Sequence, residues 1–411
     1  MWFAPIEYSK AAADNCITRL QQQLERGETE FDYDERLGYL KSLLAALQVP
    51  VESQMLVFSK TSLQRNRISP RTPRAIYFSD EVYIGFCQSG DVLEISAVDP
   101  KLGTVFYTLD QHDQKKPRFT RQTDSCLICH SSSRTDGVPG HVVRSLFVDP
   151  SGQPILSAGS NTVDHTTPMA ERWGGWYVTG EHGDQKHLGN LVIRGRDVPR
   201  PVENDEGLNV TELADRFAVD RYLSPHSDIV ALMVLEHQAL VHNRLTKAGY
   251  AVRQALHYEA MMNKALGEPS DHRLDSTTRR IQGAGDDLVE ALLMVDEAEL
   301  TAPNEGASGF ATNLSQRGPR DHHGRSLRDF DLRQRMFKYP CSYLIYSRAF
   351  DELPDEMRDY VWRRLWQVLA ENEDPETFAH LTVEDKRAIV EIIRQTKDGL
   401  PQYWKADNNE S

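Results

Sequence analysis

Long hydrophobic runs and an excess of basic residues are both missing from this chain. None of its apolar stretches approaches the roughly 20 residues that cross a bilayer as a helix, so the sequence predicts a protein that does not span a membrane. Its 47 Lys and Arg residues are outnumbered by 61 Asp and Glu residues, giving a net charge of −14. Without surplus cations to replace the counterions of a phosphate backbone, nucleic acid is excluded as a partner.

Cysteine is scarce, with five residues in 411. Cys16, Cys87 and Cys341 are far apart and odd in number, so at most one disulfide can form among them, and the sequence does not choose the pair. Cys341 lies in the apolar stretch 339–346, where a buried free thiol is favoured.

The two remaining cysteines belong to the run Cys126-Leu127-Ile128-Cys129-His130. C-x-x-C-H is the attachment signature of c-type haem, in which two thiols add to the vinyl groups of the porphyrin and the histidine is an axial ligand of the iron. Two intervening residues allow one turn of backbone to present both sulfur atoms to the same ring edge. The sequence therefore predicts one covalently attached haem c at Cys126, Cys129 and His130.

Two other uses of a C-x-x-C pair remain open. A zinc site needs about four ligands, and the chain has neither a second C-x-x-C nor an H-x-x-x-H pair. A thioredoxin-like redox pair needs a strand followed by a helix, a context that the flanking sequence does not indicate. Haem attachment is the favoured interpretation.

Hydrophobic periodicity divides the chain into three regions. Residues 1–50 form a helical cap with amphipathic helices at 14–26 and 34–48, residues 51–198 are β-rich and carry the motif, and residues 199–411 are mainly helical and complete the haem pocket. The predicted fold class is α+β, with an antiparallel β-rich haem-bearing region flanked by an N-terminal helical cap and a C-terminal helical region.

Individual elements follow from the same periodicity and from turn residues. Strands are expected at 74–78, 82–86, 93–98 and 104–109, with a hairpin whose arms are 142–148 and 154–158. A polar linker is expected around 199–209. Helices are expected at 228–247, 251–266, 284–299, 325–337, 355–371 and 383–398.

The segment 164–183 is rich in side chains suited to a haem. His165 and Met169 are candidates for the sixth iron ligand, and Arg172 is a candidate partner of a propionate. Trp173 and Trp176 flank two glycines and are candidates for packing on the porphyrin face. The alternative is an ordinary strand and loop whose aromatic side chains fill the core.

His237 is a further candidate for the distal side of the iron. At 100 degrees per residue it falls between Met233 and Val241 in an apolar stripe, whereas His242 points about 140 degrees away, so one straight helix cannot bring both to one iron. A hydrogen-bonded core histidine is the alternative, and Met233 is a more remote candidate ligand.

Several stretches together resemble a family of large bacterial exported proteins that carry one haem-attachment motif. They are 56–62, 98–110, 126–130, 164–165 with 173–176, and 339–347. The resemblance implies haem c binding and a periplasmic location, and it carries roles only to Cys126, Cys129 and His130. The N-terminal residues 1–15 have no basic start and apolar core of a secretory signal, so this expectation assumes that a leader has been removed.

Two functional classes follow. In the first, a strong sixth ligand such as His165 or Met169 makes the protein a monohaem electron carrier. In the second, the sixth position is open, and His237, His165 or Arg172 assists peroxide or oxygen chemistry; a haem-based sensor is a weaker third possibility. Electron transfer is the leading prediction, with the redox partner or small-molecule substrate undetermined.

Overall fold

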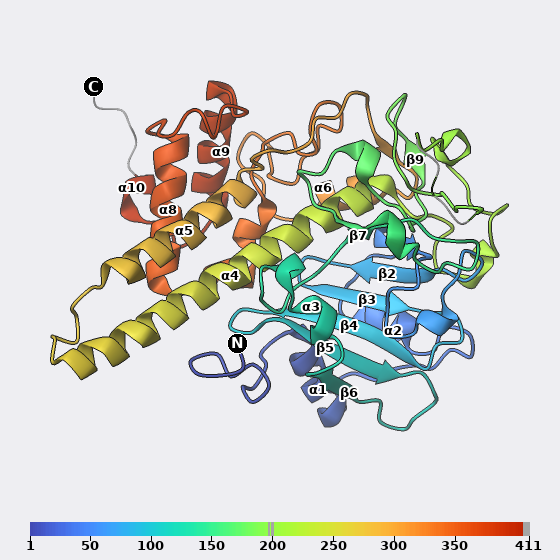
Figure 1. Cartoon of the computed structure of the whole chain (residues 1–411), viewed down its shortest axis with the longest axis horizontal. Helices are drawn as coiled ribbons and strands as arrows, with labels where there is room; N and C mark the ends of the chain where they lie inside the picture. The colour runs from blue at the N-terminus through green and yellow to red at the C-terminus, as the bar shows by residue number, and fades with distance from the viewer. Residues whose placement is uncertain (196–197, 199–200, 406–411) are drawn as a thin grey trace.

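The computed structural model describes residues 1–195, 198 and 201–405 of the chain. It has the predicted mixed α+β composition, built around a six-stranded antiparallel sheet in which every strand pairs with its neighbour in sequence (Figure 1). The strands are β1 (Met55–Val57), β2 (Arg74–Phe78), β3 (Val82–Phe86), β4 (Val92–Asp99), β5 (Gly103–Asp110) and β6 (Phe119–Gln122). The four strands expected at 74–109 are confirmed.

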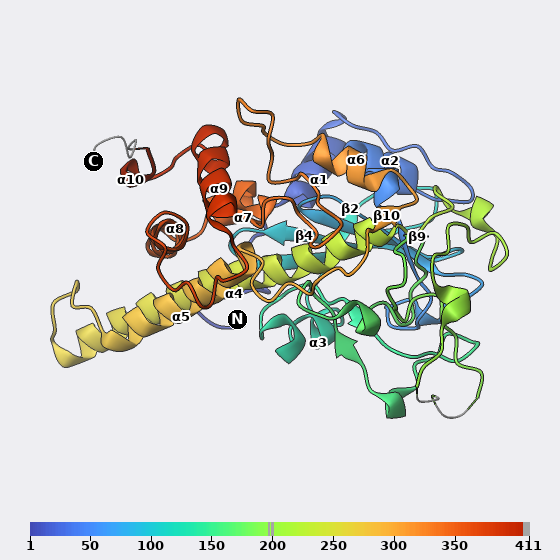
Figure 2. The same ribbon diagram turned by 90° about the horizontal axis from the view of Figure 1, so that it is seen from above.

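Side chains alternate between the two faces of the sheet along each strand, and the two faces have different surroundings. One face, with Tyr77, Ile84, Ile95 and Tyr107 paired across four strands, is buried against the N-terminal residues. The opposite face is turned toward the segment that carries the C-x-x-C-H motif (Figures 1 and 2).

The N-terminal cap consists of α1 (Cys16–Arg26) and α2 (Leu40–Ala46), within the predicted ranges. Asn15 begins α1 by accepting hydrogen bonds from the backbone of Ile17 and Thr18, and its amide nitrogen lies 2.9 Å from the hydroxyl of Tyr107. One side chain therefore caps the helix and fastens it to the sheet.

The predicted hairpin at 142–158 forms only near its turn, where the N–H of Gly152 donates to the carbonyl oxygen of Asp149 at 2.9 Å. Only the bridge between Val148 and Pro154 joins its arms, and β7 (Arg144–Ser145) pairs instead with β8 (Asn161–Thr162). Proline has no N–H to continue a ladder, and Pro154 lies at the start of the second arm. The sequence also missed β1 and β6, which are short. A further pair joins β9 (Gly180–Glu181) to β10 (Glu305–Gly306).

The helices predicted at 228–247 and 251–266 are one helix, α4 (Ile229–Leu266), which runs across the molecule (Figure 2). Asp228 caps its start by accepting hydrogen bonds from the backbone of Val230 and Ala231. It ends at Gly267, whose φ of 73° is in the left-handed region that favours glycine.

The other helices agree with the prediction in part. The helix expected at 284–299 is shifted, because Met294 and Asp296 have positive φ and end it early. No helix forms at 325–337, where Asp331 accepts hydrogen bonds from the backbone of Arg333 and Gln334 in a turn. The helices not yet given are α3 (Leu127–His130), α5 (Asp275–Leu292), α6 (Phe310–Ser315), α7 (Arg348–Asp351), α8 (Asp355–Leu369), α9 (Val383–Thr396) and α10 (Gln402–Lys405).

The largest hydrophobic core joins both the β-rich and the helical regions. It contains Tyr83 and Trp173 together with Leu232 of α4 and Leu365 of α8. The predicted boundary between these regions, at 198–199, and the start of the expected linker fall partly on residues 199–200, which lie outside the described residues.

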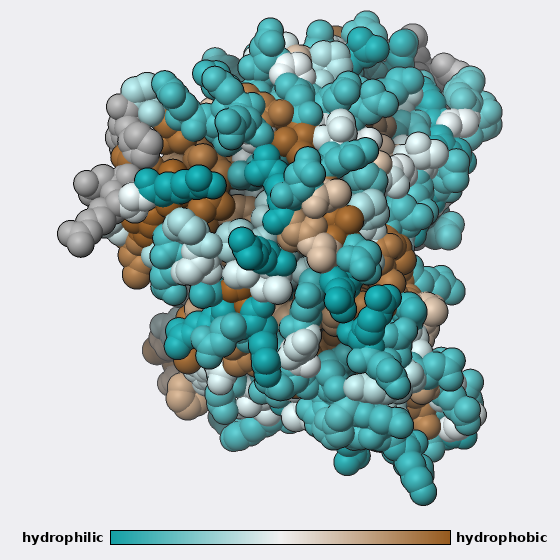
Figure 3. Space-filling view, turned by 90° about the vertical axis from the view of Figure 1, so that its right-hand side faces the viewer, coloured by the Kyte–Doolittle hydropathy of each residue, from teal (hydrophilic) through white to brown (hydrophobic). Residues whose placement is uncertain are grey.

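One broad face of the molecule is mainly hydrophilic, with hydrophobic side chains in separate patches (Figure 3). Within the described residues, no helix combines the length and the apolar character needed to cross a membrane.

Candidate haem site

The C-x-x-C-H motif forms the short helix α3 and the residue before it. Side chains three positions apart share a helix face, and both cysteine side chains line the same cavity. Between them, Leu127 is buried in the core and Ile128 is 79% exposed. The local helix therefore presents both thiols together while Leu127 anchors it.

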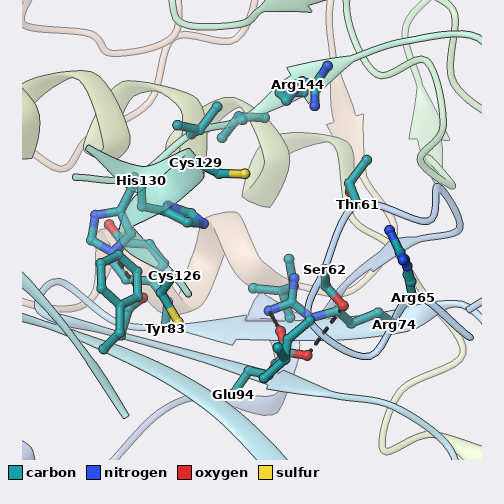
Figure 4. Close-up of a pocket in the computed structure, with 18 of the residues that line it drawn as sticks. Thr61, Ser62, Arg65, Arg74, Tyr83, Glu94, Cys126, Cys129, His130 and Arg144 are labelled. Carbon is teal, nitrogen blue, oxygen red and sulfur yellow. Dashed lines mark hydrogen bonds and ion pairs between the residues drawn. The ribbon is translucent and has the colours of Figure 1, made fainter. Parts of the chain in front are cut away.

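The cavity has a volume of about 510 Å³, within the range of about 300–1,000 Å³ that is typical of cofactor and ligand pockets. Cys126, Cys129 and His130 lie on one side of it, and Ser62, Arg65 and Arg74 lie across from them (Figure 4). The three residues of the motif thus face one shared space.

His130 is held in a defined orientation by a glycine ten residues later. Its Nδ1 lies 3.0 Å from the carbonyl oxygen of Gly140, and the N–H of Gly140 donates to the carbonyl oxygen of His130 at 2.8 Å. Donation from Nδ1 to this carbonyl leaves the lone pair of a neutral imidazole on Nε2, the arrangement that metal-ligating histidines adopt.

The backbone next to Gly140 is in turn held by Asn243 of α4. The side chain of Asn243 accepts a hydrogen bond from the N–H of His141 at 2.9 Å and donates to the carbonyl oxygen of the same residue at 2.9 Å. A β-carbon on Gly140 would fall 2.2 Å from Oδ1 of Asn243. Glycine is required at this position because the amide approaches the backbone so closely.

The floor of the cavity is the face of the sheet that is turned toward the C-x-x-C-H motif, opposite the face that packs on the N-terminal residues. Two rows of paired residues cross it, one containing Ile76, Gly85, Glu94 and Thr108. The second contains Tyr83, Ser96 and Phe106, and all of these side chains or backbones line the cavity. Phe106 also packs on the ring of His130, with centroids 4.8 Å apart.

Arg74 is the central cation of the floor. Its guanidinium lies over Gly85 and forms an ion pair with Glu94 at 2.9 Å. Lys60, Arg65 and Arg144 also line the cavity and make no ion pair with a described residue. The walls therefore offer more positive than negative charge in a chain that is acidic as a whole.

Three buried polar atoms of residues that line the cavity have no hydrogen-bond partner among the described residues: Nε of Arg74, Nε of Arg144 and the hydroxyl of Tyr83. These atoms are themselves buried in the surrounding protein rather than exposed to the open cavity, so they do not report on a ligand in it. Two thiols, a histidine with a free Nε2, an apolar floor and guanidinium groups together fit a covalently attached porphyrin with two carboxylates.

The predicted distal ligands lie away from this cavity. His165 and His237 contact each other instead, with Nδ1 atoms 3.1 Å apart, and Nε2 of His237 lies 2.8 Å from the hydroxyl of Ser342. Both histidines and Met169 are buried, and none lines the cavity. Burial lowers the pKa of His165 to about 4.

His141 is the second histidine that lines the cavity, and the sequence did not single it out. Its Nε2 lies 3.0 Å from the hydroxyl of Ser96 and its Nδ1 lies 3.3 Å from that of Thr104. Both ring nitrogens are thus engaged by the sheet. Among the described residues that line the cavity there is no methionine.

Arg172 and Trp173 are also part of the core rather than of the cavity. Arg172 pairs with Glu236 of α4 at 3.0 Å, and the indole N–H of Trp173 donates to the same carboxylate. Burial raises the pKa of Glu236 to about 7. Trp176, in contrast, lines the cavity and donates from its indole to the carbonyl oxygen of Arg144 at 2.7 Å.

Sequence reasoning missed Arg74, Tyr83, Glu94 and Arg144. A signal was present, because Arg74, Tyr83 and Glu94 occupy positions of one face in strands that were predicted correctly. Such a pattern also fits a solvated outer face, so it places these side chains together on one face without identifying a cavity.

The three cysteines outside the motif are free, and Cys341 is buried as predicted. No family model, curated protein or solved structure matches this chain. Among the described residues, no group of three or more His, Cys, Asp or Glu side chains is arranged to hold a metal ion.

Proposed function

We propose that this chain is a periplasmic monohaem c-type protein that takes part in electron transfer. The observation that carries the proposal is that Cys126, Cys129 and His130 line one cavity that Lys60 and Arg65, which form no ion pair with a described residue, also line. The periplasmic location belongs to the proposal, because thioether attachment takes place outside the bacterial plasma membrane.

Each part of the cavity has a role in holding the cofactor. Cys126 and Cys129 would form the thioether bonds, and Nε2 of His130 would be the axial ligand, oriented by Gly140. Across from the thiols lie Arg65, which forms no ion pair with a described residue, and Arg74, which is paired with Glu94, and both are candidate partners of the haem carboxylates (Figure 4). When bound, the haem supplies one-electron redox chemistry whose potential depends on this environment.

A second candidate function is an oxidoreductase whose haem has an open axial position. It is favoured by the engagement of both ring nitrogens of His141 with Ser96 and Thr104 and by the location of His165, Met169 and His237 outside the cavity. In such a site Arg74, on the cavity floor, would stabilise negative charge on a small ligand.

The test is expression of the chain with a secretion leader and the cytochrome c maturation machinery. Mass spectrometry of the denatured protein is expected to show one covalent haem, which Cys126→Ala with Cys129→Ala abolishes. Cys16→Ala is the matched control and retains it. Folded protein without covalent haem under these conditions would contradict the proposal.

Optical and electron paramagnetic resonance spectra of the ferric protein then separate the two functions. An open axial position predicts high-spin iron that binds cyanide readily. Low-spin iron that does not bind cyanide would indicate two protein ligands and a simple electron carrier.

A further inference from the structure

Arg144, which lines the cavity, and Arg134, which lines a neighbouring hollow, converge on the hydroxyl of Ser160. Nη2 of Arg144 donates to the hydroxyl of Ser160 at 2.7 Å, and Nη2 of Arg134 lies 3.4 Å from the same oxygen. Neither arginine forms an ion pair with a described residue, and Nε of Arg144 is buried without a partner. Two like charges that converge on one hydroxyl repel each other, so this pair of arginines favours an anionic group from outside.

Large apolar side chains are exposed around the same opening. Leu156 is 76% exposed and Leu63 is 56% exposed, and both line the cavity. Ile128, between the two cysteines, is 79% exposed. We call Leu63, Ile128, Arg134, Arg144 and Leu156 the docking patch. Exposed apolar groups with a charged rim are typical of protein interfaces rather than of sites for small anions.

The haem of the proposed function does not account for Arg134 and Arg144. Thioether bonds would hold the vinyl edge of the porphyrin at the cysteines, and its propionates project from a different part of the ring. Arg144 lies on the same side of the cavity as Cys129 (Figure 4). Its charge therefore remains available at the edge where electrons would enter or leave.

We infer that the docking patch receives a small acidic electron-transfer protein. This inference rests on the proposed function, because the patch surrounds the edge at which the haem would be attached. With a net charge of −14, the chain repels an acidic partner over most of its surface, and the two arginines are a local exception. Such a field steers the partner to one orientation, while Leu63, Ile128 and Leu156 supply the apolar contact that excludes water.

The first experiment measures binding and needs no haem. An acidic plant-type ferredoxin and a basic mitochondrial cytochrome c are the probes, tested against the immobilised full chain at low ionic strength. We expect the ferredoxin to bind, with an association rate that Arg134→Glu lowers about threefold to tenfold. The difference disappears in about 0.5 M salt, where charges are screened. Arg280→Glu, an exposed reversal on α5, is the matched control.

The apolar part of the patch has its own control. Leu156→Gln is expected to raise the dissociation rate of the ferredoxin, whereas Leu266→Gln, at a position 65% exposed at the end of α4, leaves it unchanged. In the haem-loaded chain, stopped-flow reduction by reduced ferredoxin is expected to slow with Arg134→Glu and not with Arg280→Glu.

Three results would overturn the inference. They are equal effects of Arg134→Glu and Arg280→Glu, tighter binding of the basic probe, and competition by inorganic phosphate at constant ionic strength, which would make the two arginines a small-anion site. Loss of covalent haem with retained, Arg134-dependent ferredoxin binding would count against the proposed function alone.

Discussion

A β-carbon placed on Gly85 would fall 2.3 Å from Nη2 of Arg74, so the guanidinium occupies the space that a side chain would fill. Gly85→Ala is expected to displace Arg74 from Glu94 and to lower the free energy of unfolding by about 1–3 kcal/mol, because a carboxylate that is largely buried loses its partner. Gly283→Ala is the control, since no described residue has an atom within 4 Å of its β-carbon position, and is expected to stabilise α5 by about 0.5–1 kcal/mol. Urea unfolding checks both, and equal effects would show that Arg74 is not fixed by the glycine.

The two hydrogen bonds between the side chain of Asn243 and the backbone of His141 lead to a prediction about the spectrum of the haem-loaded protein. Asn243→Ala is expected to cost about 1–3 kcal/mol and also to change the spin state or reduction potential of the loaded protein, because the loop that orients His130 loses its contact with α4. Asn263 is the control: it lies on the same helix, is 1% exposed, and donates to the carbonyl oxygen of His272 at 2.7 Å. Asn263→Ala is expected to cost similar stability with an unchanged spectrum.

The buried pair of Arg172 and Glu236 predicts strong non-additivity. Glu236→Leu alone leaves a buried guanidinium without its partner and is expected to cost about 3–5 kcal/mol, as is Arg172→Met. The double variant is expected to be more stable than either single variant. Denaturant unfolding of the four proteins measures the coupling, and simple additivity would argue against the pair. Covalent haem content of the folded variants is expected to remain that of the wild type.

Glu297 predicts a pH dependence of stability. Burial raises the pKa of its carboxyl to about 7, although the N–H of Met336 donates to it at 2.7 Å. The folded state thus binds the proton more tightly than the unfolded state does, and this contribution is present at low pH and is lost as the pH rises from the ordinary glutamate value through about 7. As the pH rises from about 5 to about 8, the free energy of unfolding of Glu297→Gln is expected to increase by about 2 kcal/mol relative to that of the wild type.

The control for this comparison is the exposed Glu299, two residues away. Unfolding free energies of Glu297→Gln, Glu299→Gln and the wild type, measured by urea across this pH range, test the assignment. A difference between Glu297→Gln and the wild type that stays constant with pH would contradict it.

Short-range patterns in the sequence were reliable where one face of an element is buried. The strands at 74–109 were found at their predicted positions, with alternating burial in β2 and the first part of β4, and the apolar stripe around His237 correctly indicated a buried position in a helix. The alternative of a hydrogen-bonded core histidine describes its contacts with His165 and Ser342. The C-x-x-C-H spacing likewise corresponds to a local helix that brings both thiols to one cavity.

Contacts between residues far apart in sequence could not be predicted from such patterns. Arg172 is 64 residues from Glu236 in sequence, and no periodicity links them, so its place in the core was not foreseeable. The same holds for Asn243 and His141. Short strands such as β1 carry too few residues to establish a period of two, and the turn at Asp331 depends on side-chain hydrogen bonds that composition does not predict.

The order of strands in the sheet has a consequence for the order of events during folding. All six strands pair with sequence neighbours, so the platform under the cavity needs no residue beyond Gln122, and the cysteines follow directly. Contacts that are local in sequence form early. Under the proposed function, cofactor attachment would begin, once the chain has crossed the membrane, while the cavity is still open on one side, and the docking of α4 with Leu235 and Asn243 would close it afterwards.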